Sequence, residues 1–73
     1  MNLANYKAAK KLFDKKVLTK QEAVYAAVLW DKAALDLQNA SSADSKGCKD
    51  NANWLRNQIS LLKDGGYLLL AGD

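Results

Sequence analysis

Residues 19–39 read TKQEAVYAAVLWDKAALDLQN, and the spacing of their apolar side chains predicts a helix with two apolar faces. The broad face holds small and large apolar residues, namely Ala23, Ala26, Ala27, Trp30, Ala33, Ala34 and Leu37. The second face holds Val24, Val28 and Leu35. Because each apolar face needs a partner that shields it from water, we expect this helix to be the middle element of a bundle or half of a subunit interface.

A capping box marks the start of this helix. Thr19 stands three residues before Glu22 and directly before the apolar run. In such a box the threonine hydroxyl accepts a hydrogen bond from the glutamate amide, and the glutamate carboxylate accepts one from the threonine amide. These bonds satisfy two backbone donors that a helix N-terminus leaves free, so we expect the helix to begin at Thr19 and to end near Asn39.

The residues around this cap, 11–23, read KLFDKKVLTKQEA. This segment resembles the helical hairpin of short oligomerisation modules of the SHOCT type, in which a helix, a tight turn, an Ile/Leu-Thr pair and an acidic cap follow in order. Leu18, Thr19 and Glu22 match that order, whereas Lys16 stands where the turn of the family usually carries glycine. The resemblance is one of local geometry and covers under a third of the chain.

A first helix is expected over residues 3–16, ahead of this turn. Its apolar side carries residues at helical spacing, namely Tyr6, Ala9, Phe13 and Val17. The opposite side carries a row of lysines spaced four residues apart: Lys7, Lys11 and Lys15. We therefore expect the first and second helices to form a hairpin that is held together by their apolar sides.

A third helix is predicted from Cys48 onward, because apolar residues recur there four and three positions apart. These residues are Cys48, Ala52, Leu55, Ile59 and Leu62. We place the break before this helix between Ala40 and Lys49, in a serine-rich stretch, and expect Gly65 to close the helix in a left-handed conformation. The apolar residues that follow, 67–71, form a tail that has to dock on the helices or on another protein.

The predicted fold class is all-α, with residues 1–73 in a single small three-helix bundle, made of a helical hairpin and a third helix, and an apolar C-terminal tail. At 73 residues, one hydrophobic core gives only marginal stability. The single cysteine excludes a disulfide within the chain, and the absence of histidine leaves no plausible zinc site. We therefore expect a homo-oligomer, in which contacts between subunits supply further stability.

Few residues are suited to chemistry, so we expect no enzyme, no catalytic residues, no metal and no cofactor. Acid–base catalysis most often uses histidine, and the chain has none. Asp31 borders the apolar surface of the second helix, where we expect it to bond a lysine, Arg56 or a backbone group at a helix contact. Cys48 begins the apolar stripe of the third helix, so we expect a small buried hydrophobe instead of a reactive thiolate.

Large apolar residues outside the predicted core are candidates for partner binding, because aromatic side chains anchor many interfaces. Trp54 and Leu61 form a second strip on the third helix, whereas Trp30 is expected in the core. Tyr25 and Leu29 are four residues apart on the second helix, outside its broad face. The full set of partner-binding candidates is Trp54, Leu61, Tyr25, Leu29, Tyr67 and Leu69.

Positive charge is concentrated at the N-terminal end of the chain. The first 20 residues hold six lysines and one aspartate, while the whole chain has a formal net charge of +3. The row of Lys7, Lys11 and Lys15 could contact the phosphates of a nucleic acid without sequence preference. The row supports neither base recognition nor base stacking, because Tyr6 and Phe13 face the other way, and a solvated helix face is the simpler explanation.

The function that these features favour is a small non-enzymatic protein–protein interaction module, which self-associates and acts by blocking or recruiting a larger partner. Helical accessory proteins of this size are frequent in phages and mobile elements, which is an analogy of class alone. The alternative is a nucleic-acid-associated accessory protein that uses Lys7, Lys11 and Lys15. Attachment to a membrane surface through the first helix is a weaker hypothesis, because the core needs its apolar side.

No segment of the sequence predicts export or membrane insertion. The N-terminus lacks a continuous apolar region, and the longest apolar run, residues 67–71, is too short to span a bilayer. The solitary cysteine indicates a reducing compartment. We therefore expect a cytoplasmic protein that does not bind membranes.

Overall fold

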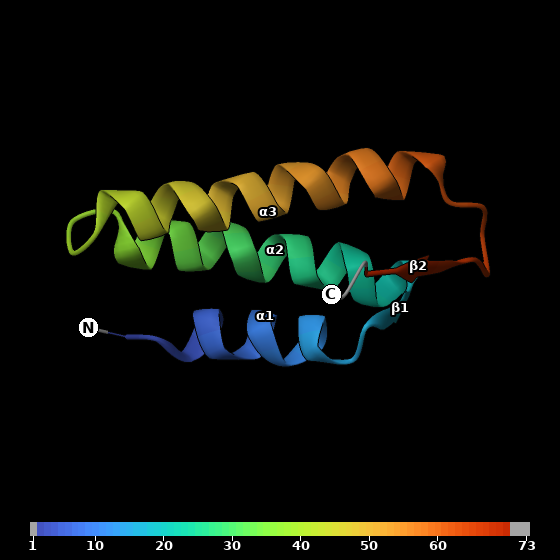
Figure 1. Cartoon of the computed structure of the whole chain (residues 1–73), viewed down its shortest axis with the longest axis horizontal. Coiled ribbons are helices and arrows are strands. Elements are labelled where there is room, and N and C mark those ends of the chain that lie inside the picture. Colours follow the sequence, from blue (N-terminus) through green and yellow to red (C-terminus); the bar gives the residue numbers. More distant parts are fainter. Residues whose placement is uncertain (1, 71–73) are drawn as a thin grey trace.

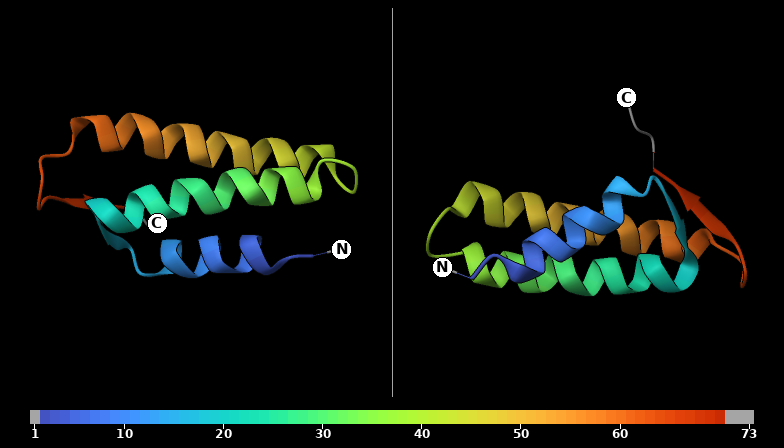
Figure 2. Two further views of the ribbon diagram at one scale, coloured as in Figure 1. Left: turned by 180° about the vertical axis from the view of Figure 1, so that it is seen from behind. Right: turned by 90° about the horizontal axis from the view of Figure 1, so that it is seen from below.

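The computed structural model describes residues 2–70, in which the chain is mostly helical (Figure 1). These residues form three helices and two short strands in the order α1 (Ala4–Asp14), β1 (Val17–Thr19), α2 (Lys20–Leu37), α3 (Ser42–Leu61) and β2 (Tyr67–Leu69). The helices form a small elongated bundle, and the strands pair into a ribbon at one end of it (Figure 2).

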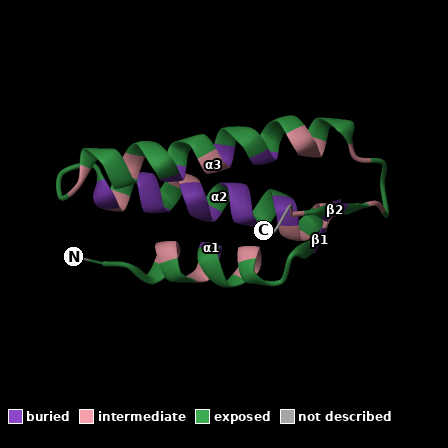
Figure 3. Cartoon of the chain, in the orientation of Figure 1, coloured by how far each residue is buried: buried purple, intermediate pink, exposed green. Residues whose placement is uncertain are grey.

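α2 is the middle helix of the bundle, which is one of the two predicted arrangements, and α1 and α3 pack on opposite flanks of its broad face. α1 and α3 lie on either side of α2 and contact it (Figures 1 and 2). The residues that α2 buries are those of the broad face together with Leu29 (Figure 3). The second face, with Val24, Val28 and Leu35, remains exposed. One apolar face of α2 therefore has no cover from the part of the chain that the structure describes.

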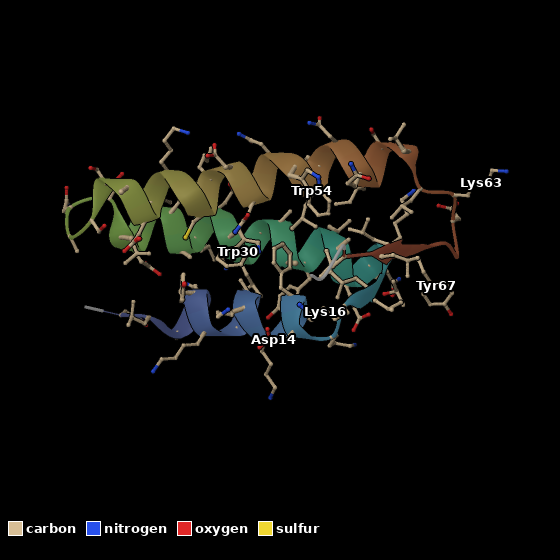
Figure 4. The ribbon with its side chains drawn as sticks, in the orientation of Figure 1. Asp14, Lys16, Trp30, Trp54, Lys63 and Tyr67 are labelled. Carbon is tan, nitrogen blue, oxygen red and sulfur yellow. The ribbon has the colours of Figure 1, made fainter. Side chains whose placement is uncertain are left out.

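Trp30 fills the space between α2 and α1, in the core where we predicted it (Figure 4). Its ring packs edge-on against Tyr6, with 5.6 Å between the ring centroids, and tilted against Phe13 at 5.2 Å. The alanines of the broad face are small, so the neighbouring helices can approach α2 closely. The indole N–H of Trp30 is buried and has no hydrogen-bond partner within residues 2–70.

The predicted capping box is present at the start of α2. The Thr19 hydroxyl accepts a hydrogen bond from the Glu22 amide at 3.1 Å, and the Glu22 carboxylate accepts one from the Thr19 amide at 3.0 Å. The helix ends at Leu37, slightly before the predicted end at Asn39. The start of this helix, which a complete capping box marks, was thus predicted more closely than its end.

α3 begins at Ser42, so the predicted start at Cys48 was wrong. The Ser41 hydroxyl accepts a hydrogen bond from the Asp44 amide at 3.3 Å and caps the helix. Gly47 lies inside α3. The helix tolerates it there because an exposed helical glycine costs only about 1 kcal/mol relative to alanine. The serine-rich stretch is therefore mostly the first two turns of α3.

The predicted helix end at Gly65 was also wrong, since α3 ends at Leu61 and the next residue is extended. Gly65 does adopt a left-handed conformation, with φ of 80°, but it belongs to the turn that leads into β2. At the other end of the ribbon, Lys16 has φ of 66° and turns the chain from α1 into β1. These two residues set the directions in which the strands enter the ribbon.

The apolar tail docks on the chain itself as strand β2, which pairs antiparallel with β1. Leu18 lies opposite Leu68, and both are buried against the helices. The prediction of an all-α fold was therefore wrong at this end of the molecule, where Val17 belongs to a strand and not to the apolar side of the first helix. Ala71, the last residue of the predicted tail, lies outside the described residues.

Candidate functional site

Two groups of large apolar side chains are exposed on the surface. The first, which we call the α2 outer face, consists of Val24, Tyr25, Val28 and Leu35. The second, which we call the ribbon outer face, consists of Val17, Tyr67 and Leu69. Isolated exposed apolar residues are common in proteins, whereas groups that share one face more often mark interaction sites.

The α2 outer face follows from helical spacing. Val24 and Val28 are one turn apart, and Leu35 lies two turns farther along the same side, beside a groove that α2 forms with α3. Leu35 is 65% exposed, more than the two valines, and Tyr25 flanks the row. Since α1 and α3 occupy the broad face, only another molecule or residues beyond those described could cover this side.

The ribbon outer face follows from strand alternation. Neighbouring residues of a strand point to opposite faces, so the burial of Leu18 and Leu68 places Val17, Tyr67 and Leu69 outward. Figure 4 shows Tyr67 at the end of the molecule, pointing away from the helices. Our sequence reasoning missed Val17, although a β-branched residue directly after a turn is a signal for a strand.

A groove of about 640 Å³ connects the two faces. Its walls include Val24 from the α2 outer face and Tyr67 from the ribbon outer face. Lys20 crosses one side of it, where its ammonium group donates to the Leu62 carbonyl at 3.2 Å and pairs with the Asp64 carboxylate at 3.3 Å. One apolar side chain from each face therefore lines the same groove, whose other lining residues are polar or glycine, and an ion pair lies at its rim.

The other predicted partner-binding residues are distributed differently. Trp54 and Leu61 are exposed on α3, whereas Tyr25 belongs to the α2 outer face and Tyr67 and Leu69 belong to the ribbon outer face. Leu29 is only 5% exposed, so its predicted place outside the core was wrong.

The burial of Leu29 has a simple geometric reason. It lies two helical turns from Asp36, on the flank of α2 that faces α1. Asp36 accepts a hydrogen bond there from the Asn5 side chain of α1 at 2.9 Å. Because α1 covers this flank, Leu29 packs in the core and cannot bind a partner in the folded chain.

The predicted lysine row is divided by an ion pair. Lys15 pairs with Glu22, which also accepts from the Thr19 amide. The hydrogen bond from Lys15, followed by the one from the Thr19 backbone, lowers the pKa of the Glu22 carboxyl below its usual range. Lys7 and Lys11 remain exposed on α1, and neither makes an ion pair within residues 2–70.

Asp31 has the structural role that we predicted. Its carboxylate pairs with Arg56 and, at 3.3 Å, with the Lys49 ammonium group, both from α3. A second tie between the helices is the Ser45 hydroxyl, which donates to the Ala34 carbonyl at 2.6 Å. These polar contacts fix the position of α3 along α2, and they leave the Asp31 carboxylate engaged with cations.

The remaining candidate for chemistry, Cys48, is buried in the core. Burial, together with the negative charge of Asp44, raises the pKa of its thiol. A buried thiol with a raised pKa is a poor nucleophile at neutral pH, since the thiolate is the reactive form. Within residues 2–70, no group of three or more histidine, cysteine or acidic side chains is arranged to hold a metal ion.

Comparisons with known proteins give no match to a protein-family model, to a curated protein or to a solved structure. Among the described residues, none of the helices combines the length and the apolar character needed to cross a membrane. The function therefore has to be inferred from the surface chemistry of the chain itself.

Proposed function

We propose that the protein is a small non-enzymatic protein–protein interaction module, which self-associates and binds a larger partner through its exposed apolar faces. The observation that carries this proposal is the α2 outer face. A helix in the middle of the fold leaves one whole apolar side, with Val24, Val28 and Leu35, exposed to water.

The energetics favour a shared face over scattered contacts. Fully burying one large aliphatic side chain contributes roughly 1.5–3 kcal/mol. Association costs an estimated 4–15 kcal/mol in lost rigid-body freedom, so one or two side chains do not hold a complex together. The α2 outer face and the ribbon outer face together offer seven large apolar residues that are 43–71% exposed, so burying both faces gains free energy of the same order as that cost.

Two measurements test this proposal. Light scattering coupled to size exclusion, at high micromolar concentration, is expected to give a mass above the 8.0 kDa of one chain. Affinity capture from the source cells with the tagged wild-type protein is expected to recover a partner that the double variant Val24→Glu/Val28→Glu loses. The matched control is Asn57→Glu, which introduces the same charge at an exposed polar position of α3. A monomeric mass together with no face-dependent partner contradicts the proposal.

A second candidate function is non-specific association with nucleic acid through α1. The observation that favours it is the pair Lys7 and Lys11, which lie one helical turn apart on the exposed side of α1 without acidic partners among the described residues. Ammonium groups in this arrangement attract phosphates, and the attraction weakens as the salt concentration rises. Lys15 contributes less than the sequence suggested, because Glu22 neutralises it.

A further inference from the structure

β2 presents an unpaired backbone edge to solvent. The Leu70 amide donates to the Lys16 carbonyl at 2.8 Å, which makes residues 16 and 70 a hydrogen-bonded pair of the antiparallel ribbon. Such pairs alternate along an antiparallel ladder. The backbone groups of Leu68 therefore face β1, and those of Tyr67 and Leu69 face away from it. No other backbone partner is present for these outward groups within residues 2–70.

The opposite edge of the ribbon, on β1, is closed by the cap of α2. The Thr19 amide donates to the Glu22 carboxylate at 3.0 Å. The Thr19 carbonyl belongs to an N-cap residue, so it accepts the first hydrogen bond of the helix. A further strand can therefore add to the ribbon on β2 but not at Thr19 on β1.

β2 also lacks the features that normally protect an edge strand. Proteins discourage pairing at free edges with proline, with charged side chains such as lysine, or with bulges. Residues 67–70 read YLLL and contain none of these residue types. Tyr67 and Leu69 are 64% and 71% exposed, so no other part of the described chain shields the edge side chains.

We infer that β2 pairs antiparallel with β2 of a second copy of the chain, around a two-fold axis through Leu68. This inference rests on the proposed self-association and names the surface that would perform it. In this register Tyr67 of each copy lies opposite Leu69 of the other, as a hydrogen-bonded pair that uses the outward groups. Leu68 lies opposite Leu68 as a non-bonded pair, which suits a residue whose own groups face β1.

A second copy fits this edge because the edge is complementary to itself. The two-fold axis places an aromatic ring opposite an aliphatic side chain on both sides, a favourable cross-strand pair. No charged side chain lies between Gly65 and Leu70, so the axis brings no like charges face to face along the strands. The two-stranded ribbons merge into one antiparallel sheet with β1 at both edges, where the α2 caps close it.

The size of this contact sets its strength. Stable complexes bury about 800 Å² on each partner. One chain exposes 4885 Å² in total, and a strand of three residues covers only a small share of it. The dimer is therefore concentration-dependent, and we expect it to form in the high micromolar range.

Sedimentation equilibrium of the full chain from about 10 µM to about 1 mM tests the inference, because weak dimers dissociate on the order of this concentration range. The wild-type mass is expected to rise from 8.0 kDa toward twice that value. Leu69→Pro removes an outward amide that β1 does not use, so the variant is expected to stay monomeric with an unchanged circular dichroism spectrum. The comparison variant Leu69→Ala keeps the amide and loses only the cross-strand side-chain contact, so it is expected to dimerise more weakly than the wild type but still to dimerise.

A second measurement does not depend on any variant. In a mixture of isotope-labelled and unlabelled wild-type protein, a filtered NOE experiment is expected to show contact between the α-protons of Leu68 in the two copies. Non-bonded antiparallel pairs bring these protons close together. Dimeric wild-type protein without this contact overturns the inference.

The outcomes separate this inference from the proposed function. Leu69→Pro protein that folds and dimerises like the wild type overturns the β2 contact but leaves self-association through another face standing. Wild-type protein that stays at 8.0 kDa up to the highest concentration overturns the contact, whereas capture of a partner through the α2 outer face still supports an interaction module. An edge that binds extended apolar peptides in preference to a second copy also overturns the inference.

Discussion

The backbone of Lys16 is in the left-handed region, with φ of 66°, which is unfavourable for residues that carry a Cβ atom. The left-handed region costs a non-glycine residue roughly 1–2 kcal/mol, which glycine avoids. Glycine in turn lowers the free energy of unfolding by about 0.5–1 kcal/mol, because it is more flexible in the unfolded chain. We therefore predict that Lys16→Gly raises the free energy of unfolding by about 0.5–1 kcal/mol, as measured by urea denaturation. The control Lys10→Gly, inside α1, is expected to lower it by about 1 kcal/mol. Equal effects of the two changes would contradict the assigned turn.

Glu22 makes the stability of the fold depend on pH. Its carboxyl has a pKa below the usual 4.5 because Lys15 and the Thr19 amide hydrogen-bond the charged form. A group whose pKa is lower in the folded state stabilises the fold above its unfolded pKa, and this contribution disappears as the pH falls through the folded pKa. We predict that wild-type protein is more stable than Glu22→Gln at pH 7, and that the difference shrinks progressively below pH 4.5.

Chemical denaturation of both proteins at a series of pH values checks this prediction. Glutamine keeps an oxygen that can accept from the Thr19 amide, so the comparison isolates the charge. A stability difference that is the same at pH 7 and at pH 3 would show that the ion pair with Lys15 contributes nothing.

Several residue-scale features of the chain were predictable because they are local, although the equally local cap between Ser41 and Asp44 was missed. The bonds between Thr19 and Glu22 join residues three apart, and the sequence alone predicted them. The pairing of Asp31 with Arg56 was among the predicted alternatives, because Asp31 borders the apolar surface of the second helix. The burial of Leu29 was not predicted, because it depends on which flank of α2 the helix α1 covers.

At the scale of elements, the ribbon shows why short strands escape prediction. A helix of 18 or 20 residues repeats its apolar pattern several times, whereas each strand here has three residues and no repeat. The strands exist because Leu18 and Leu68, far apart in sequence, pack together on the same helices. Only the tertiary arrangement brings these two residues together.

The alternation along β2 leads to a stability prediction. Leu68 is buried, so Leu68→Ala leaves a cavity and is expected to lower the free energy of unfolding by about 2–4 kcal/mol. Leu69 is exposed, so Leu69→Ala is expected to change it by less than about 0.5 kcal/mol. Denaturation at low micromolar concentration, where the chain is monomeric, measures both values. Similar effects of the two substitutions would contradict the register of the ribbon.

The exposed lysines of α1 give an element-scale test of the second candidate function. If they bind phosphates, wild-type protein retards duplex DNA in a gel at low salt, and the retardation falls steeply as salt rises. The double variant Lys7→Glu/Lys11→Glu is expected to lose this retardation, whereas Lys63→Glu, an exposed control beyond α3, is expected to keep it. If wild-type protein fails to retard DNA at low salt, these lysines do not bind nucleic acid and serve only to keep the protein soluble.

At the scale of the whole molecule, the sequence predicted a middle helix with two apolar faces, and the fold uses one of them. α1 and α3 share the broad face, because the alanines there allow both helices to approach. Periodicity identified the second face equally well, yet it could not say whether a third element of the chain would cover it. Whether the second face is covered depends on where the tail docks. The tail pairs with β1 and does not lie on the second face.

This division between a covered and an uncovered apolar surface predicts how stability depends on concentration. A partner that binds only the folded chain stabilises it by mass action, and in a dimer the partner is the chain itself. Once dimers dominate, each tenfold rise in concentration adds roughly 0.7 kcal/mol per chain, which raises the melting temperature of a domain of this size by roughly 3–5 °C. Calorimetry of wild-type protein from the high micromolar range upward is expected to show this rise, and Leu69→Pro is expected to melt at one temperature throughout. A wild-type melting temperature that is independent of concentration would mean that the uncovered surface is reserved for a different protein.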